Sequence, residues 1–279
     1  MKKISRRSFL AAAGLSVAAL ALTACGGSSA STASSVASSA ASSEAASTSA
    51  AAGELTTVEA GKLTMATNAA FPPYEMTTDA GEFKGIDIET AQAIADKLGL
   101  ELQIDDMDFD AALLSVQQGK ADIVMAGVTV TDERKAVMDF SDSYATGIQS
   151  IIVPEGSDIA SPDDLAGKKI GTQRGTTGYI YCSDDFGDEN VVAYDDGLTA
   201  VQALNNGQVD AVVIDNAPAQ EFIAANPGLK ILDTSYAEED YAIGMAKGSS
   251  LEDAVNAALE ELKADGTLQS IVDKYITAE

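Results

Sequence analysis

Short apolar segments alternate with helical segments along most of this 279-residue chain, and this alternation limits the folds that the chain can adopt. In the first half, strands are expected at residues 62–67, 102–104 and 122–126, with helices at 88–98 and 110–118 between them. Each helix ends at a glycine, Gly99 or Gly119, and glycine accepts the left-handed conformation that commonly ends a helix. The pattern predicts the α/β class with a largely parallel sheet.

The same alternation restarts after residue 150 and predicts a second α/β unit. Strands are expected at 151–153, 169–172 and 211–214, helices start near Ser161, Gly175, Gly197 and Pro218, and two helices at 251–262 and 268–275 end the chain. Residues 113–122 and 197–210 both contain a helix that stops at glycine before an aspartate opens a strand. Two lobes with facing strand ends would form a cleft for a ligand, although such a repeat could also arise in any α/β sheet.

The first 25 residues have the order of features found in an export signal. Basic residues up to Arg7 precede an apolar segment at 9–22, which is too short to span a membrane as a helix. Residues 22–25, Leu-Thr-Ala-Cys, resemble a bacterial lipobox, in which the cysteine receives lipid and becomes the mature N-terminus. Arg6-Arg7 also resembles a twin-arginine motif, so the export route stays open, and an uncleaved anchor is the alternative.

The next segment is expected to be a flexible tether. Residues 25–56 consist almost wholly of Ser, Ala, Thr and Gly, so they cannot bury an apolar core. A signal peptide at 1–24, a lipidated Cys25 and a tether would hold the folded part at the extracytoplasmic face of the cell membrane.

Charge and residue usage exclude several classes of function. The chain has 17 basic and 43 acidic residues, and phosphate binding needs a basic surface, so no nucleic-acid partner is expected. The absence of histidine excludes Ser-His-Asp and Cys-His catalysis and histidine-containing zinc sites. Cys25 and Cys182 are the only cysteines, so there is no disulfide framework. Residues 106–110 resemble only the start of a calcium loop, and no cofactor or metal is expected.

One segment, residues 122–135, places an arginine where helix geometry disfavours it. Thr131 can cap a helix that begins directly after an apolar strand. Arg134 lies in the first turn of this helix, where the helix dipole disfavours a cation by roughly 0.3–1 kcal/mol. Such an arginine could bind an anion, and a carboxylate is the natural partner because a guanidinium can donate two parallel hydrogen bonds to it. The alternative is a surface arginine paired with Asp139 or Asp142.

Five blocks of sequence carry a more specific pattern. They are ATNAAFPPYE at 66–75, GIDIE at 85–89, MDF at 107–109, AGVTVTDERK at 126–135 and DFSD at 139–142. These blocks resemble the family 3 solute-binding proteins for polar amino acids, which include glutamine-binding and lysine/arginine/ornithine-binding proteins. The resemblance covers nearly all of residues 60–277.

The resemblance implies the type II periplasmic-binding-protein fold, in which two α/β lobes joined by two hinge strands close on a ligand. Lobe 1 would comprise residues 57–149 plus 244–279, and lobe 2 residues 150–243. The crossings between the lobes would lie near 147–151 and 240–244.

The resemblance also implies how the charges of an amino acid would be bound. Arg134 would bind the α-carboxylate, helped by the backbone N–H groups of Thr129 and Thr177. Asp215 would bind the α-ammonium group, together with the Gly127 carbonyl and the Thr129 hydroxyl. From the sequence alone, Asp215 could instead be a turn residue or a helix cap.

Four further positions would contact the ligand side chain. Phe71 and Phe109 would sandwich it and offer stacking or cation–π contact, unless they belong to the core. Asn68 and Gln173 occupy positions that vary with specificity in the family. Members that bind cationic ligands often have Asp at the Asn68 position, and glutamine binders often have Lys at the Gln173 position. Glu75 could add charge to this end of the site or be a loop residue.

The function implied by the resemblance is that of a lipid-anchored, monomeric receptor without enzymatic activity. It would bind a free polar amino acid and deliver it to the membrane permease of an ABC importer. The alternatives are an enzyme of the same fold, such as a cyclohexadienyl dehydratase with a catalytic carboxylate, and a sensor ligand-binding protein. The identity of the amino acid stays open.

Overall fold

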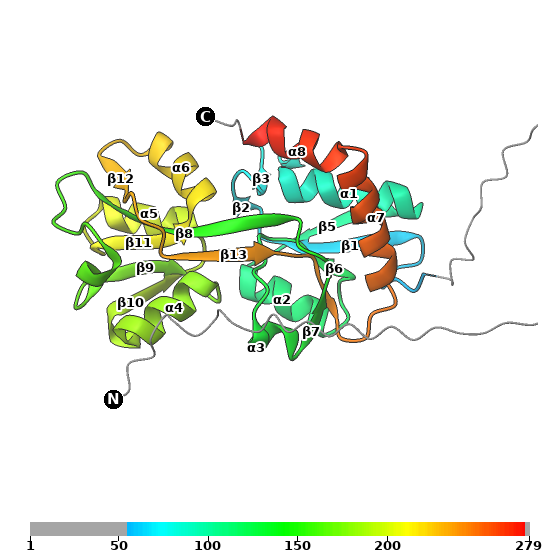
Figure 1. Cartoon of the computed structure of the whole chain (residues 1–279), viewed down its shortest axis with the longest axis horizontal. Helices are drawn as coiled ribbons and strands as arrows, with labels where there is room; N and C mark the ends of the chain where they lie inside the picture. Colours follow the sequence, from blue (N-terminus) through cyan, green and yellow to red (C-terminus); the bar gives the residue numbers. More distant parts are fainter. Residues whose placement is uncertain (1–54, 277–279) are drawn as a thin grey trace, which may run out of the picture. The chain divides into compact units, whose positions relative to one another are not determined.

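The computed structural model describes residues 55–276, which form two main sheets with helices packed against them (Figure 1). The expected signal peptide, nearly all of the tether and Cys25 lie outside the described residues. Within residues 55–276, no helix combines the length and the apolar character needed to cross a membrane.

The first lobe is built on a five-stranded sheet with the order β5-β1-β6-β14-β7. Its strands are β1 (Lys62–Thr67), β5 (Glu101–Asp106), β6 (Ile123–Val124), β7 (Met138–Phe140) and β14 (Gly244–Ala246). Strand β1 pairs in parallel with β5 and β6, whereas β14 pairs antiparallel with β6 and β7. The lobe also contains α1 (Ile86–Leu98), α2 (Phe109–Gln117), α3 (Asp132–Lys135), α7 (Glu252–Ala264), α8 (Thr267–Tyr275) and a small sheet of β2 (Ala70–Phe71), β3 (Glu75–Thr77) and β4 (Phe83–Lys84).

The second lobe is built on a sheet with the order β10-β9-β11-β8-β12, to which β13 adds by pairing with β8. Its strands are β8 (Ala145–Pro154), β9 (Ile170–Gln173), β10 (Val191–Tyr194), β11 (Ala211–Asp215), β12 (Leu229–Ile231) and β13 (Ala237–Tyr241). Its helices are α4 (Thr177–Phe186), α5 (Gly197–Asn205) and α6 (Asn216–Ala225), with 3-10 turns η1 (Pro162–Leu165) and η2 (Asp188–Asn190). Strands β10, β9 and β11 are parallel, but β8 pairs antiparallel with β11, β12 and β13, so this sheet is mixed and the prediction of a largely parallel sheet is only partly correct.

The chain passes between the two sheets twice, and the two passages lie side by side. Strands β8 and β13 are antiparallel partners from Ala145 opposite Tyr241 to Gln149 opposite Ala237, and both are seen between the lobes in Figure 1. Residues 149–152 of β8 already pair with β11, so the first passage overlaps the start of the predicted crossing near 147–151. The predicted fold of two α/β lobes joined by two strands is confirmed.

Two predicted elements are shorter than expected. The strand predicted at 122–126 is only the two-residue β6, because the segment turns toward the pocket at Gly127, which has φ +56°. The helix predicted from Ser161 is the single 3-10 turn η1, in which the side chain of Asp164 accepts hydrogen bonds from the backbone N–H and hydroxyl groups of Ser161. A capping box can stabilise one turn without a longer helix following it.

Each lobe has an apolar core between its sheet and its helices. In lobe 1, Leu63 and Met65 of β1 and Ile94 of α1 are fully buried with Leu259 of α7. The face of α7 predicted from its apolar spacing is the buried face, which explains why this C-terminal helix returns to lobe 1. In lobe 2, the core contains Ile151, Ile170, Val213 and Leu165.

Gly147 lies where β8 passes the aromatic ring of Tyr241 on β13, and even a methyl group would collide there. A Cβ atom at position 147 would lie 2.5 Å from three atoms of the Tyr241 side chain, two in the ring and the hydroxyl oxygen, and this side chain is fully buried. We expect Gly147→Ala to lower the free energy of unfolding by about 1–3 kcal/mol, the usual cost of overpacking, as measured by urea denaturation. Gly156→Ala is the matched control, because no atom lies within 4 Å of its Cβ position. Equal losses in the two variants would contradict this explanation.

Candidate functional site

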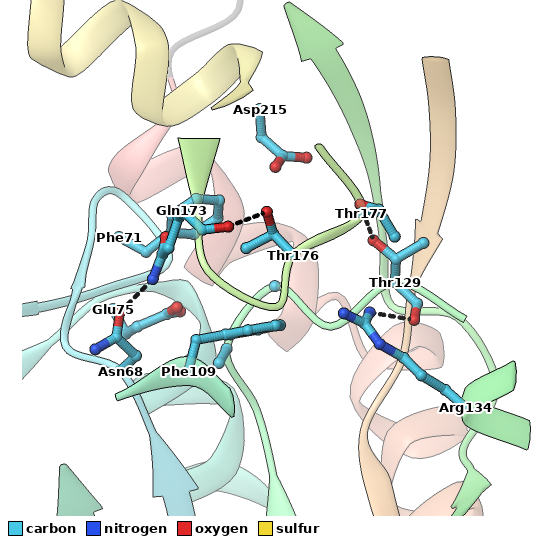
Figure 2. A pocket seen from close by; sticks show the side chains of 12 residues that line it. Asn68, Phe71, Glu75, Phe109, Thr129, Arg134, Gln173, Thr176, Thr177 and Asp215 are labelled. Carbon is cyan, nitrogen blue, oxygen red and sulfur yellow. Dashed lines mark hydrogen bonds between the residues drawn. The ribbon is translucent and has the colours of Figure 1, made fainter. Parts of the chain in front are cut away.

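A pocket between the lobes brings together polar and aromatic side chains from both of them (Figure 2). It is lined by Asn68, Phe71, Glu75, Phe109, Ala126, Gly127, Thr129, Arg134, Gln173, Thr176, Thr177 and Asp215. All nine residues expected to contact a ligand are in this set, and their roles in binding stay predictions.

Arg134 is buried at one end of the pocket and its guanidinium group spans the two lobes. Helix α3 begins as expected, because the Thr131 hydroxyl accepts a hydrogen bond of 3.1 Å from the Arg134 N–H. The Arg134 Nη1 donates to the Thr129 carbonyl at 2.8 Å, and Nη2 donates to the Gly175 carbonyl of lobe 2 at 3.1 Å. The guanidinium also lies 5.4 Å from the centre of the Phe109 ring.

The alternative of a surface arginine is wrong. Arg134 is only 8% exposed, and burial lowers its pKa because desolvation disfavours the charged form. Asp139 instead forms an ion pair of 2.6 Å with Lys247. An arginine buried against carbonyl groups still has donor capacity for an incoming anion, since the guanidinium carries five N–H groups.

Asp215 lies at the end of β11, and its carboxylate faces the pocket from lobe 2 (Figure 2). It accepts hydrogen bonds from the Gln149 side chain at 2.8 Å and from the Tyr241 hydroxyl. Burial raises the pKa of Asp215 to about 7, against the opposing effect of these hydrogen bonds. Asp215 occupies the N-cap position of α6, but its side chain makes no capping hydrogen bond to that helix and faces other partners instead.

A second buried carboxylate, Glu239 of β13, connects the two lobes beside Arg134. Its Oε2 accepts from the hydroxyl groups of Thr129 in lobe 1 at 3.2 Å and Thr177 in lobe 2 at 2.9 Å, and from the Gln149 amide at 3.0 Å. The sequence analysis missed Glu239, Gln149 and Tyr241. For Glu239 and Tyr241 a signal existed, because they alternate with exposed residues at the period of a strand.

The opposite end of the pocket is built from side chains of lobe 1 that meet Gln173 of lobe 2. The Gln173 amide donates to the Asn68 carbonyl oxygen at 2.9 Å (Figure 2). The Asn68 amide donates to the Met107 carbonyl at 2.9 Å. Phe71 and Phe109 line this part of the pocket and also pack into the apolar core. Each ring can therefore be a core residue and still face a ligand.

Glu75 is the most unusual residue of the pocket. Its side chain is fully buried, and within residues 55–276 no hydrogen-bond donor reaches either carboxyl oxygen. Burial and the nearby Asp87 raise the pKa of Glu75 well above its ordinary value. Because an unpaired buried carboxylate is costly, this position calls for either a proton or a cation. Across residues 55–276, no cluster of three or more candidate metal-ligating side chains is present.

Known proteins match most of the chain. The family of bacterial extracellular solute-binding proteins, family 3, matches residues 63–278. The chain is 33% identical over 226 residues to the L-cystine-binding protein TcyJ of Escherichia coli, covering 79% of this chain and 85% of that protein. It is 33% identical over 228 residues to the arginine-binding extracellular protein ArtP of Bacillus subtilis, covering 78% and 87%. The structure of an ancestral arginine-binding protein bound to glutamine superimposes with a TM-score of 0.75 and 42% identity, covering 78% of this chain and 99% of that one.

Proposed function

The chain belongs to the bacterial extracellular solute-binding proteins, family 3, and from this membership we propose that it is the amino-acid receptor of an ABC importer. Its fold is the type II periplasmic-binding-protein fold. The receptor binds a free polar amino acid between its two lobes and delivers it to the membrane permease.

The observation that carries this proposal is the pair of opposite charges, Arg134 and Asp215, in one pocket. A zwitterion that leaves water needs a partner for each charge, because otherwise the cost of desolvation dominates. Arg134 belongs to lobe 1 and supplies the partner of the α-carboxylate. Asp215 belongs to lobe 2 and supplies the partner of the α-ammonium group. A ligand that contacts both lobes stabilises the closed arrangement over an open one, which couples binding to closure.

The charges of the pocket favour an amino acid with a cationic side chain. Among the described residues that line the pocket, Arg134 is the only basic one, whereas Glu75 and Asp215 are both acidic. Asp215 is assigned to the α-ammonium group, so Glu75 remains for a second cation. Family members that bind cationic ligands often have an aspartate at the Asn68 position, so Asn68 weakened an arginine or lysine assignment. In this pocket the negative charge for a cationic side chain would come from Glu75 instead. The name of the arginine-binding protein ArtP agrees with this proposal, whereas the ancestral arginine-binding protein was solved with glutamine bound.

We also propose that the receptor is a monomer anchored to the extracytoplasmic face of the cell membrane through lipid on Cys25. The Leu-Thr-Ala-Cys motif and the tether at 25–56 support this anchoring. The lobe boundaries at 57–149 plus 244–279 and at 150–243 are likewise part of the proposal. The matched relatives are named as binding proteins, and no observation favours a dehydratase or a sensor.

A thermal-shift screen of free amino acids tests the proposed function. L-arginine, L-lysine, L-histidine, L-glutamine and L-cystine should be compared with a buffer blank. A ligand at 100 times its Kd stabilises the folded protein by about 2.7 kcal/mol, which raises the unfolding midpoint measurably. We expect L-arginine to give the largest shift. The absence of a shift with every amino acid would contradict the proposed function.

A further inference from the structure

Two carboxyl groups, Glu75 of β3 and Asp87 of α1, are buried together next to the pocket. The start of helix α1 packs directly against the backbone at Tyr74. The approach is so close that a Cβ atom at Gly85 would lie only 2.1 Å from the Tyr74 carbonyl oxygen. Gly85 has φ +133°, so glycine is required there for its conformation as well. The Asp87 N–H donates to the same Tyr74 carbonyl at 2.9 Å, which fixes Asp87 beside the residue that precedes Glu75.

The two carboxyl groups have very different partners. Asp87 Oδ2 accepts hydrogen bonds from the Gly127 N–H at 3.0 Å and from the Tyr144 hydroxyl at 2.8 Å. Among the described residues, Asp87 Oδ1 and both oxygens of Glu75 have no donor. Asp87 is therefore the better anion, and Glu75 is the group that can carry a proton and donate it in a hydrogen bond to the carboxylate of Asp87.

The acidic neighbours of Glu75 make its ionisation less favourable. Asp87 of α1, Asp106 of β5 and Asp215 of β11 all act on it as acids, and burial has the largest effect on its pKa. Burial also raises the pKa of Asp87 to about 6, although the hydrogen bonds from Gly127 and Tyr144 oppose this rise. Tyr74 and Tyr144, the tyrosines near the pair, have raised pKa values and stay neutral.

We propose that Glu75 and Asp87 share one proton while the pocket is empty, and that the cationic side chain of a basic amino acid displaces this proton when it binds. The proton leaves Glu75 for solvent, and the Glu75 carboxylate then pairs with the cation of the ligand. Capture of the ligand is thereby coupled to release of a proton. This inference rests on the proposed function, because it takes the ligand to be a basic amino acid.

The coupling sets the direction of the pH dependence. The empty protein holds a proton that the complex lacks, so the affinity for a basic amino acid rises with pH up to the pKa of Glu75, by up to about tenfold per pH unit. Asp215, with a pKa raised to about 7, adds a separate release when it binds the α-ammonium group. That contribution is common to all amino acids, so a neutral ligand of the same shape separates the two effects.

Isothermal titration calorimetry can count the released protons. L-arginine and its neutral isostere L-citrulline should be titrated near neutral pH in two buffers with different enthalpies of ionisation. We expect L-arginine to release about one more proton than L-citrulline from the unmodified protein. Glu75→Gln keeps the shape of the protonated acid and a donor for Asp87, and it should lose this excess together with about 30-fold or more in L-arginine affinity. Glu82→Gln, at an exposed position between β3 and β4, is the matched control and should keep both.

Infrared difference spectroscopy gives a readout that does not depend on how tightly the variant binds. The empty protein should show a protonated-carboxyl band that is missing from Glu75→Gln, and saturating L-arginine should remove this band from the unmodified protein. No such band in the empty protein, or equal proton release with L-arginine in the unmodified protein and Glu75→Gln, would overturn the inference. Binding of L-glutamine without L-arginine would overturn it too and leave the proposed function intact, whereas no binding of any amino acid would contradict the proposed function itself.

Discussion

Replacing Arg134 by alanine should remove most of the affinity for an amino acid. The substitution leaves the α-carboxylate of the ligand buried without its charged partner, and stripping one member from a buried charge pair costs about 2–5 kcal/mol. The Kd for L-arginine should therefore rise by roughly 30-fold to 5,000-fold, measured by isothermal titration calorimetry. The effect should extend to every amino acid that the protein binds, because all of them carry the α-carboxylate.

Two further variants separate the role of Arg134 from general effects of charge. Arg174→Ala removes a nearby arginine that is exposed and paired with Asp195 at 3.2 Å, so it should leave the Kd within about twofold, in keeping with the small energies of surface ion pairs. Arg134→Lys keeps the charge but cannot donate to the Thr129 and Gly175 carbonyls while binding a carboxylate in two places, and it should have an intermediate affinity. Equal affinities of Arg134→Ala and Arg174→Ala would contradict the carboxylate assignment.

Features encoded in short stretches of sequence could be predicted well. The order of strands and helices follows from apolar spacing and glycine stops, and the Thr131 cap before Arg134 needs only neighbouring residues. Local patterns also place Asp215 at the end of strand β11 and Thr129 a few residues after strand β6, and both residues line the pocket. The lengths of the elements were less predictable. The two-residue strand β6 and the single turn η1 are short because the chain changes direction directly after each of them.

The contacts that were missed depend on strands far apart in the sequence. Gln149 of β8 and Glu239 of β13 meet because these strands pair, although 90 residues separate them. The hydrogen bond from Tyr241 to Asp215 likewise joins different strands. Glu75 could not be assigned from the sequence, since its burial and its closeness to Asp87 come from the packing of α1 against β3. Non-local pairing therefore determines the charge balance of the site, which the family motifs alone do not specify.

Replacing Asp215 by asparagine should weaken binding and leave the fold at least as stable. The amide has nearly the same shape and can still accept a hydrogen bond from Gln149 or Tyr241, but it offers no charge to the α-ammonium group. We expect a loss of about 2–5 kcal/mol of binding free energy with every amino acid, again measured by isothermal titration calorimetry. Asp195→Asn, which changes an exposed carboxylate, should bind as the unmodified protein does. Asp215→Asn with unchanged affinity would contradict the α-ammonium assignment.

The stability of the same variant distinguishes a binding role from a structural one. Burial raises the pKa of Asp215 from 3.8 to about 7, so between these values the folded protein holds a proton that the unfolded chain has released. The free energy of unfolding of the unmodified protein therefore falls as the pH rises through this range, and asparagine at position 215 removes that loss. Urea denaturation at acidic and at mildly alkaline pH should show Asp215→Asn gaining stability relative to the unmodified protein as the pH rises. A carboxylate that lowers the stability of the empty protein while its charge strengthens ligand binding is serving the ligand.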